Sequence, residues 1–377
     1  MSTNILEILP VDPANPLAIM PDLEEALTGA RSLLPVPAND PTRAALLRTT
    51  QGVGEPIDSE VALVVSTSGS TGIPKGAELT AANLISSADA THQQLGGAGQ
   101  WMMAMSAAYI AGIQVLVRSM VAGVEPEFVD LTHGFDVAEF VAKTHRLAAS
   151  GERCYTSMSP LQLTKAISTL DGIEALRAYT AILVGGAAPS PRLLDSAAKL
   201  RINVVTSYGC SETASGCVYD GRPVPGAKIE IRGGRIHIGG PMIARGYRNA
   251  PDHEAFADTG WFATSDAGAL DGDTLDIRGR LDNVIISGGL KLHPEVLEST
   301  ILGVEGVDAA TVVGVPDERF GERICAAYTG PASITDILSA LDDLPRWQVP
   351  KEIKPLASLP LLGPGKVNRP AVRDLFL

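Results

Sequence analysis

Residues 61–76 read VALVVSTSGSTGIPKG, an apolar run that ends in hydroxyl residues, glycines, a proline and a lysine. The apolar residues 61–65 predict a buried strand. Glycines let backbone N–H groups approach an anion closely, serine and threonine hydroxyls add donors, and Lys75 adds positive charge. The stretch therefore predicts a strand followed by a phosphate-binding loop, with a plain flexible turn as the alternative.

The loop differs from a Walker A motif, because Lys75 is followed by Gly76 and not by the Ser or Thr that would hold magnesium. It resembles the signature of the adenylate-forming superfamily, which includes acyl- and aryl-CoA ligases, peptide-synthetase adenylation domains and luciferases. The resemblance implies that this loop binds ATP. The loop residues that it places on ATP are Thr67, Ser68, Gly69, Ser70, Thr71, Gly72 and Lys75.

Length and composition bound the class of protein. A chain of 377 residues, with 45% hydrophobic and 19% charged residues, predicts a folded protein of two domains. The net charge of -13 disfavours nonspecific binding to nucleic acid or to an anionic membrane surface. We therefore expect no nucleic-acid partner, and any anionic substrate must meet local positive charge.

The chain is expected to be cytoplasmic and not inserted in a membrane. Its cysteines have no metal-binding or redox spacing, and its first residues show no secretory pattern. The longest apolar run, residues 101–117, is interrupted by Ser106, Gly112 and Gln114, so it predicts a strand and a helix and not a membrane span. The cysteines are Cys154, Cys210, Cys217 and Cys325.

The order of patterns predicts an α/β fold. The many prolines of residues 1–58 predict an irregular start, and from Thr80 helical and strand patterns alternate through Gly209, which predicts layered α/β sheets. A small β-rich subdomain is expected from about Gly234, and a small α+β lid domain at the C-terminus. The resemblance implies an N-terminal domain of residues 1–281 and a mobile C-terminal domain of residues 282–377, with the hinge near Asp282.

Two later strand ends resemble further superfamily signatures. Gly185-Gly186-Ala187 implies a surface along adenine and ribose, and Ser207-Tyr208-Gly209-Cys210-Ser211-Glu212 implies a second contact with ATP. Tyr208 offers a ring to stack on adenine, and Glu212 offers a carboxylate for Mg²⁺, with Thr71 as a second metal-site residue. Taken alone, residues 211–213 would predict only a helix cap.

Three more segments extend the resemblance. Gly260-Trp261-Phe262-Ala263-Thr264-Ser265-Asp266 implies that Asp266 accepts the ribose hydroxyls, although Ser265 stands where glycine is usual and would be strained at positive φ. Arg280 would contact ribose or phosphate. Gly288 and Gly289 would line the entry for CoA, with a simple hairpin as the alternative. Ile286 replaces a usual Lys or Arg.

The segment Leu362-Gly363-Pro364-Gly365-Lys366 resembles the C-terminal loop that places a lysine on the acyl and α-phosphate groups. A solitary lysine near a C-terminus would otherwise be solvated. The implied catalytic residues are Lys366, Glu212, Thr71 and Lys75.

The acid-binding residues are expected at Tyr109, Arg118, Ser157 and Gln162. Tyr109 stands where relatives carry an aromatic residue or His, and Arg118 is either a charge at the surface or core edge or a ligand for a second substrate carboxylate. The segment of residues 157–163 resembles o-succinylbenzoate–CoA ligases of menaquinone synthesis, although Ser159 before Pro160 would also serve as a helix cap.

Together the resemblances imply an AMP-forming acid–thiol ligase that uses ATP, Mg²⁺, CoA and a small carboxylic acid. It looks most like an actinobacterial o-succinylbenzoate–CoA ligase, and a homodimer is possible. The alternatives are another aryl- or acyl-CoA ligase and a non-catalytic nucleotide-binding homologue.

Overall fold

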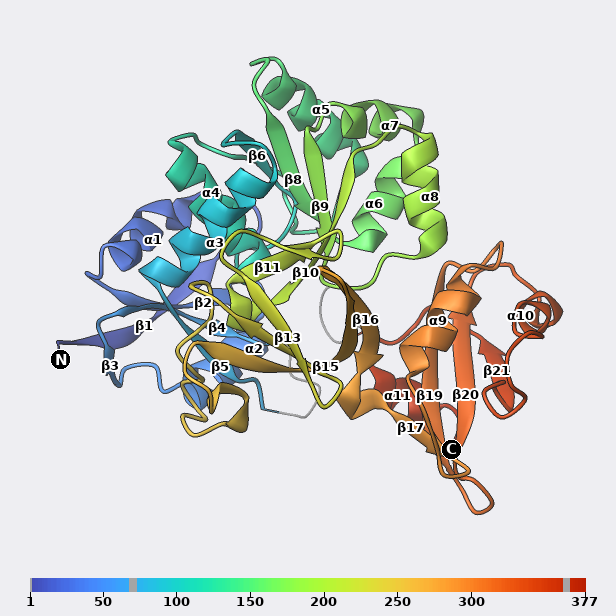
Figure 1. The fold of residues 1–377 in the computed structure, drawn as a ribbon. Coiled ribbons are helices and arrows are strands. Elements are labelled where there is room, and N and C mark those ends of the chain that lie inside the picture. The colour runs from blue at the N-terminus through green and yellow to red at the C-terminus, as the bar shows by residue number, and fades with distance from the viewer. Residues whose placement is uncertain (1, 68–72, 362–366) are drawn as a thin grey trace.

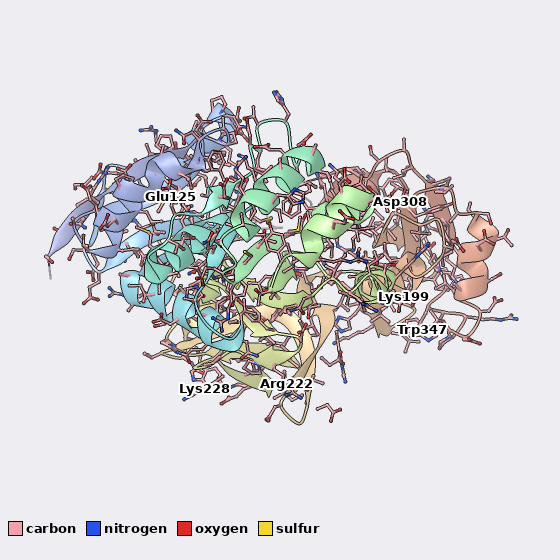
Figure 2. All side chains as sticks on the ribbon, turned by 90° about the horizontal axis from the view of Figure 1, so that it is seen from above. Glu125, Lys199, Arg222, Lys228, Asp308 and Trp347 are labelled. Atoms are coloured by element: carbon pink, nitrogen blue, oxygen red, sulfur yellow. The ribbon has the colours of Figure 1, made fainter. Side chains whose placement is uncertain are left out.

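The computed structural model describes residues 2–67, 73–361 and 367–377, whose strands form four sheets. Figure 1 shows the last sheet, orange to red, at one end of the molecule. Seen from above in Figure 2, Asp308 and Trp347 mark that end, and Glu125 lies toward the other.

The first sheet has the order β3-β1-β2-β4-β5 and carries the decisive stretch. Residues 61–65 form the buried centre of β4, as predicted, and β5 returns antiparallel to it, with Ser66 opposite Gly76. The elements of this part are β1 Thr3–Val11, η1 Pro16–Ile19, α1 Met20–Leu27, β2 Ser32–Pro37, α2 Pro41–Thr50, β3 Pro56–Asp58, β4 Val61–Ser66 and β5 Gly76–Thr80.

The expected irregular start at residues 1–58 is wrong, because β1 and β2 form a parallel pair within this sheet. Pro16, Pro21 and Pro41 lie in first turns of helices, where a missing N–H costs nothing. Strand β4 pairs with β2 only at Leu33, so the later prolines of β2 do not interrupt a ladder on that side.

The second sheet has the order β12-β11-β10-β9-β8-β6-β7 and is parallel from β7 to β10. Helix α3 begins at the predicted Thr80, which forms a capping box with Asn83, and α3 packs between the first and second sheets. The predicted strand and helix in residues 101–117 are β6 and α4. The elements are α3 Ala81–Gln94, β6 Gln100–Met103, α4 Ile110–Ala122, β7 Glu127–Phe128, α5 Val137–Ala148, β8 Cys154–Met158, α6 Pro160–Ile167, α7 Leu170–Arg177, β9 Ala181–Gly185, α8 Pro191–Lys199, β10 Val204–Cys210, η2 Ser211–Thr213, β11 Ser215–Tyr219 and β12 Arg222–Pro223.

The third sheet is antiparallel, in the order β13-β14-β15-β16, and matches the expected small β-rich part. Its strands share the large hydrophobic core of the first two sheets through residues such as Ile236, Ile238 and Phe262. Its elements are β13 Lys228–Arg232, β14 Arg235–Gly239, η3 Glu254–Phe256, β15 Trp261–Asp271, β16 Thr274–Arg280 and η4 Leu281–Asn283.

The fourth sheet has the order β18-β17-β20-β19, with β21 beside β20, and helices pack on it. Two hydrophobic clusters, drawn only from residues after 284, form its core. Its elements are β17 Ile285–Ser287, β18 Leu290–Leu292, α9 Pro294–Leu302, β19 Ala309–Asp317, β20 Gly321–Thr329, α10 Ile334–Ala340, β21 Glu352–Pro355 and α11 Arg369–Asp374. None of the helices in the described ranges combines the length and the apolar character that crossing a bilayer requires.

Candidate active site

The end of the predicted phosphate loop is held by backbone and amide contacts. The N–H of Thr67 donates to the carbonyl of Lys75 (2.7 Å), so the two ends of the loop are joined. The amides of Gln51 and Asn249 both donate to the carbonyl of Pro74 (2.8 and 2.9 Å), and the N–H of Gly76 donates to Asn249 (3.2 Å). These bonds fix the position from which Lys75 projects.

The side chains of Lys75 and Glu212 both contact Tyr247. The Lys75 ammonium is 5.2 Å from the ring centre of Tyr247, whose hydroxyl donates to Glu212 Oε1 (2.6 Å). Lys75 Nζ is also 2.8 Å from His253 Nε2. Glu212 is only 7% exposed, and burial together with Glu212 raises the pKa of Tyr247, so this phenol stays a donor. A cation and a buried carboxylate thus contact the same tyrosine where the loop ends.

A second cluster of polar side chains connects the second and third sheets. The hydroxyl of Tyr208 donates to Asp266 Oδ2 (2.7 Å), and Asp266 lies opposite Arg280, 3.6 Å from its guanidinium. Arg280 also forms a two-bond ion pair with Asp282 (2.8 and 2.6 Å). Burial raises the pKa of Asp266 above its usual range, while Tyr208 and Arg280 act in the opposite direction. The four predicted residues therefore form one cluster.

The two predicted adenine segments are neighbours, since Ser207 of β10 pairs with Gly185 of β9. A Cβ on Gly185 would lie 2.6 Å from the carbonyl oxygen of Ser207, and one on Gly209 would lie 2.1 Å from that of Ser215. Glycine is required at both positions for the strands to approach. Gly186 and Ala187 follow in an exposed turn, and Cys210 and Ser211 continue from β10 into η2.

Arg118 lies inside the protein, which contradicts the surface or core-edge alternative. It is 1% exposed, its guanidinium is 4.9 Å from the ring centre of Trp101, and one nitrogen is 3.5 Å from the Tyr219 hydroxyl. Its Nε has no hydrogen-bond partner, and no carboxylate of the described residues forms an ion pair with it. Burial lowers the pKa of Arg118. Within residues 2–67, 73–361 and 367–377, this buried charge therefore has no anionic partner.

The other predicted acid-site residues lie near the ends of β6 and β8. Tyr109 is the residue before α4 and is partly exposed, and Ser157 is nearly buried in β8. Gln162 Oε1 accepts from the N–H of Ser159 (2.8 Å), and its Nε2 donates to the carbonyl of Ala104 (2.6 Å). Helix capping at Ser159 is confirmed and accounts for Gln162 Oε1, whereas Nε2 is taken up by the contact with Ala104 outside the helix.

Several predicted residues lie outside the described residues: Ser68, Gly69, Ser70, Thr71, Gly72 and Lys366. Gly288 and Gly289, at φ +58° and +80°, form the two-residue turn of a β17–β18 hairpin, as the alternative had it. Their role toward CoA stays a prediction. The expected strain at Ser265 does not arise, because this residue lies in β15 without a positive φ. Ile286 is 50% exposed.

Sequence reasoning missed His253 and Asn249 and gave Tyr247 no role. The sequence from Gly234 through Gly246-Tyr247 resembles a further segment of the superfamily, and this resemblance could have marked the tyrosine. His253 lies 178 positions from Lys75, and no spacing links the two.

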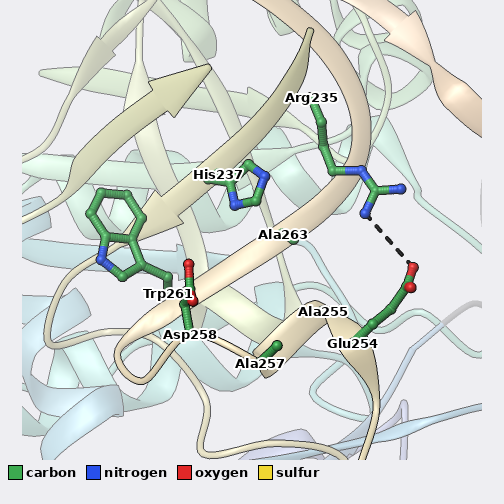
Figure 3. A pocket seen from close by; sticks show the side chains of 8 residues that line it. All are labelled: Arg235, His237, Glu254, Ala255, Ala257, Asp258, Trp261 and Ala263. Carbon is green, nitrogen blue, oxygen red and sulfur yellow. Dashed lines mark ion pairs between the residues drawn. The ribbon is translucent and has the colours of Figure 1, made fainter. Parts of the chain in front are cut away.

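A shallow pocket of about 180 Å³ lies elsewhere on the third sheet. Figure 3 shows His237 between Trp261 and Arg235, which pairs with Glu254 at 3.8 Å. The pocket contains none of the predicted site residues. His237 is partly exposed beside these side chains.

Comparison with protein-family models gives two matches. The AMP-binding enzyme model matches residues 8–248, and the AMP-binding enzyme C-terminal domain matches residues 296–366.

Named relatives cover nearly the whole chain. A probable 2-succinylbenzoate–CoA ligase of Mycobacterium tuberculosis (strain CDC 1551 / Oshkosh) is 42% identical over 370 residues, 95% of this chain and 95% of that protein. The 2-succinylbenzoate–CoA ligase of Escherichia coli (strain K12) is 27% identical over 385 residues, 97% of this chain and 81% of that protein.

Among solved structures, o-succinylbenzoate CoA synthetase from Bacillus subtilis in complex with the acyl-adenylate intermediate has a TM-score of 0.84 at 22% identity, and covers 98% of this chain and 88% of that one. Its complex with AMP has a TM-score of 0.74 at 26% identity, over 85% and 70%. This likeness confirms the predicted α/β fold class. With more than half of its length matched by the family model, the chain belongs to the family of AMP-binding enzymes.

Proposed function

We propose that the chain is an ATP-dependent, AMP-forming ligase that joins 2-succinylbenzoate to CoA. The observation that carries the proposal is that Lys75, at the end of the predicted phosphate loop, and Glu212 both contact Tyr247. A cation for the phosphates and a carboxylate for their metal ion are what MgATP needs. The relatives named as 2-succinylbenzoate–CoA ligases, and the complexes of the Bacillus subtilis synthetase, support the choice of reaction.

The donor set around Glu212 fits Mg²⁺ that arrives with the nucleotide. Within the described residues, no group of three or more His, Cys, Asp and Glu side chains could hold a metal ion. Mg²⁺ often takes one or two protein oxygens together with phosphate oxygens and water. Glu212 would supply one such oxygen, and Thr71 is proposed as a second. The bound ion would neutralise negative charge on the phosphates.

In the first half-reaction, a carboxylate oxygen of the acid attacks the α-phosphorus of ATP, and pyrophosphate leaves. Negative charge builds on the phosphate oxygens, so Lys75 and Lys366 would lower the barrier electrostatically. Asp266 and Arg280 would hold the ribose, with Tyr208 beside the adenine. The product is an acyl-adenylate.

In the second half-reaction, the CoA sulfur attacks the acyl carbon of the adenylate, and AMP leaves. We propose that residues 282–377 rotate about Asp282 between the two steps, withdrawing Lys366 and bringing Gly288 and Gly289 toward CoA. The separate hydrophobic clusters beyond residue 284 support motion of this part as a unit.

The second carboxylate of 2-succinylbenzoate would pair with Arg118. Burying a charge without a partner is costly, and this arginine lies on α4, the helix that Tyr109 precedes. One carboxylate of such an acid would be activated by ATP, while Arg118 would hold the other.

Exchange of labelled pyrophosphate into ATP, over a panel of acids, tests the first half-reaction. We expect exchange with 2-succinylbenzoate and little with benzoate or fatty acids. If another acid supports faster exchange than 2-succinylbenzoate, that acid replaces it as the proposed substrate. Absence of exchange with every acid would contradict the proposal of an adenylating enzyme.

A cytoplasmic location is also proposed, supported by four cysteines that form no disulfide. A homodimer stays a prediction, which sedimentation of the purified protein tests.

A further inference from the structure

His253 is a residue beside the phosphate loop to which the proposed mechanism gives no part. It ends the segment of residues 245–253, which follows the loop end in space. Backbone hydrogen bonds join residues 245–248 of this segment to residues 76–78, directly after the loop. The segment is therefore held against the loop end by contacts that do not depend on the His253 side chain.

The His253 ring accepts a hydrogen bond from Lys75. Lys75 Nζ lies 2.8 Å from His253 Nε2, and a lysine ammonium can only donate, so Nε2 accepts and the proton of the neutral ring is on Nδ1. The backbone N–H of Ala255 also faces Nδ1, at 3.1 Å, in the turn into η3. A neutral imidazole has only one accepting nitrogen, and the charged donor is both the nearer and the stronger one.

The surroundings of His253 keep its ring neutral and in one orientation. Burial and the charge of Lys75 lower the pKa of His253, whereas Glu254 and Glu212 act in the opposite direction on this pKa. The ring stands nearly perpendicular to that of Tyr247, with the ring centres 5.0 Å apart. His253 therefore offers Lys75 a neutral acceptor in a fixed place.

A neutral acceptor leaves the positive charge of Lys75 intact. Among the carboxylates of the described residues, none forms an ion pair with Lys75, and Glu212 accepts instead from the Tyr247 hydroxyl. The ammonium has three N–H donors, so the bond to His253 leaves two of them for oxygens of an anion. A carboxylate at position 253 would hold the ammonium as well, but it would cancel the charge and repel phosphate.

We propose that His253 is a positioning residue, which holds the Lys75 ammonium at the end of the phosphate loop for the phosphate oxygens of ATP without cancelling its charge. The task of Lys75 toward phosphate rests on the proposed function, whereas its contact with His253 does not.

Calorimetric titration of the full chain with ATP and Mg²⁺, and separately with AMP, tests the proposal. His253→Ala should weaken ATP binding about three- to tenfold, the equivalent of one net hydrogen bond, and leave AMP binding within about twofold. His253→Gln should bind ATP within about twofold of the wild type, because its side-chain oxygen can accept from the ammonium. His253→Glu should bind ATP no better than His253→Ala. His237→Ala is the matched control and should change neither affinity.

Equal or tighter ATP binding by His253→Ala would overturn the proposal, and so would an equal loss in His253→Gln or a recovery in His253→Glu. An equal loss of AMP binding in His253→Ala would show a structural role and would also overturn it. The exchange assay separates the two proposals. ATP binding that follows the expected order of variants, without exchange for any acid, keeps the positioning role and contradicts the ligase. Exchange with 2-succinylbenzoate and unchanged ATP binding by His253→Ala have the opposite meaning, and no ATP binding by the wild type would overturn both.

Discussion

At the scale of single residues, Arg118 is a buried charge that forms an ion pair with none of the described carboxylates. Its contact with Trp101 offsets only part of the cost of burying it. We predict that Arg118→Met unfolds at the same temperature as the wild type or a higher one, because a methionine fits the apolar surroundings. The same variant should raise KM for 2-succinylbenzoate at least about tenfold, since a charged hydrogen-bonded pair is lost, with KM for ATP unchanged. A marked fall in thermal stability with an unchanged KM for the acid would assign Arg118 to packing alone.

Asp266 gives a prediction about pH. Because its pKa is raised in the folded protein, the folded state binds this proton more tightly than the unfolded chain does. Stability therefore falls as pH rises from the usual aspartate range through the raised pKa. Asp266→Asn should unfold at a higher temperature than the wild type, by more at pH 8 than at pH 4, near the usual aspartate pKa, yet bind ATP at least about tenfold more weakly through loss of the charged ribose contact. Thermal unfolding at both pH values and ATP titration measure the two effects. A variant that is less stable at pH 8 would contradict the sign.

The residues that sequence could assign are those within continuous signatures. Lys75 and Glu212 come after strands and Asp266 lies within β15, each in a short recognisable run of sequence. In the structure all three belong to polar clusters. His253 could not be assigned, because its contact with Lys75 depends on how the chain returns over the first sheet. The sequence allows Arg118 either at the surface or core edge or in the acid-binding site, because a helical pattern alone does not show how deeply the helix is buried.

At the scale of elements, close strand approach at Gly209 sets the shape of the second nucleotide segment. An alanine Cβ there would lie 2.1 Å from a backbone oxygen of β11, which cannot move without separating the strands. We predict that Gly209→Ala lowers the free energy of unfolding by about 1–3 kcal/mol. Gly246→Ala is the matched control, because a Cβ there has no neighbour within 4 Å, and it should be neutral. Chemical denaturation of both variants gives the comparison, and equal stabilities would contradict the close approach.

The element pattern was predictable wherever apolar periodicity was strong, as in β4 and α4, and at the helix starts marked by Thr80 and Ser159. It failed in residues 1–58, where prolines suggested irregular chain. Their positions in first helical turns, and in β2 past its pairing with β4, show why β1 and β2 can form nonetheless.

At the scale of the whole molecule, the proposed rotation about Asp282 separates the two half-reactions. Asp282→Pro fixes the backbone φ at the proposed hinge and removes the Asp282 side chain with its ion pair to Arg280, whereas Asp282→Ala removes the same side chain and leaves φ unrestricted. We predict that the proline variant keeps pyrophosphate exchange within about threefold and loses thioester formation at least about tenfold, because rotation precedes the second step. The alanine variant should keep both. Thioester formation at the wild-type rate in the proline variant would exclude Asp282 as the hinge.

The most direct test of the account is the product formed from 2-succinylbenzoate, ATP, Mg²⁺ and CoA by the purified protein. We predict one AMP and one 2-succinylbenzoyl-CoA per acid consumed, with no AMP when the acid is omitted, measured by chromatography and mass spectrometry. No thioester from 2-succinylbenzoate, while another aryl or fatty acid is converted to its CoA ester, would contradict the proposed substrate. No thioester from any acid would contradict the proposed ligase.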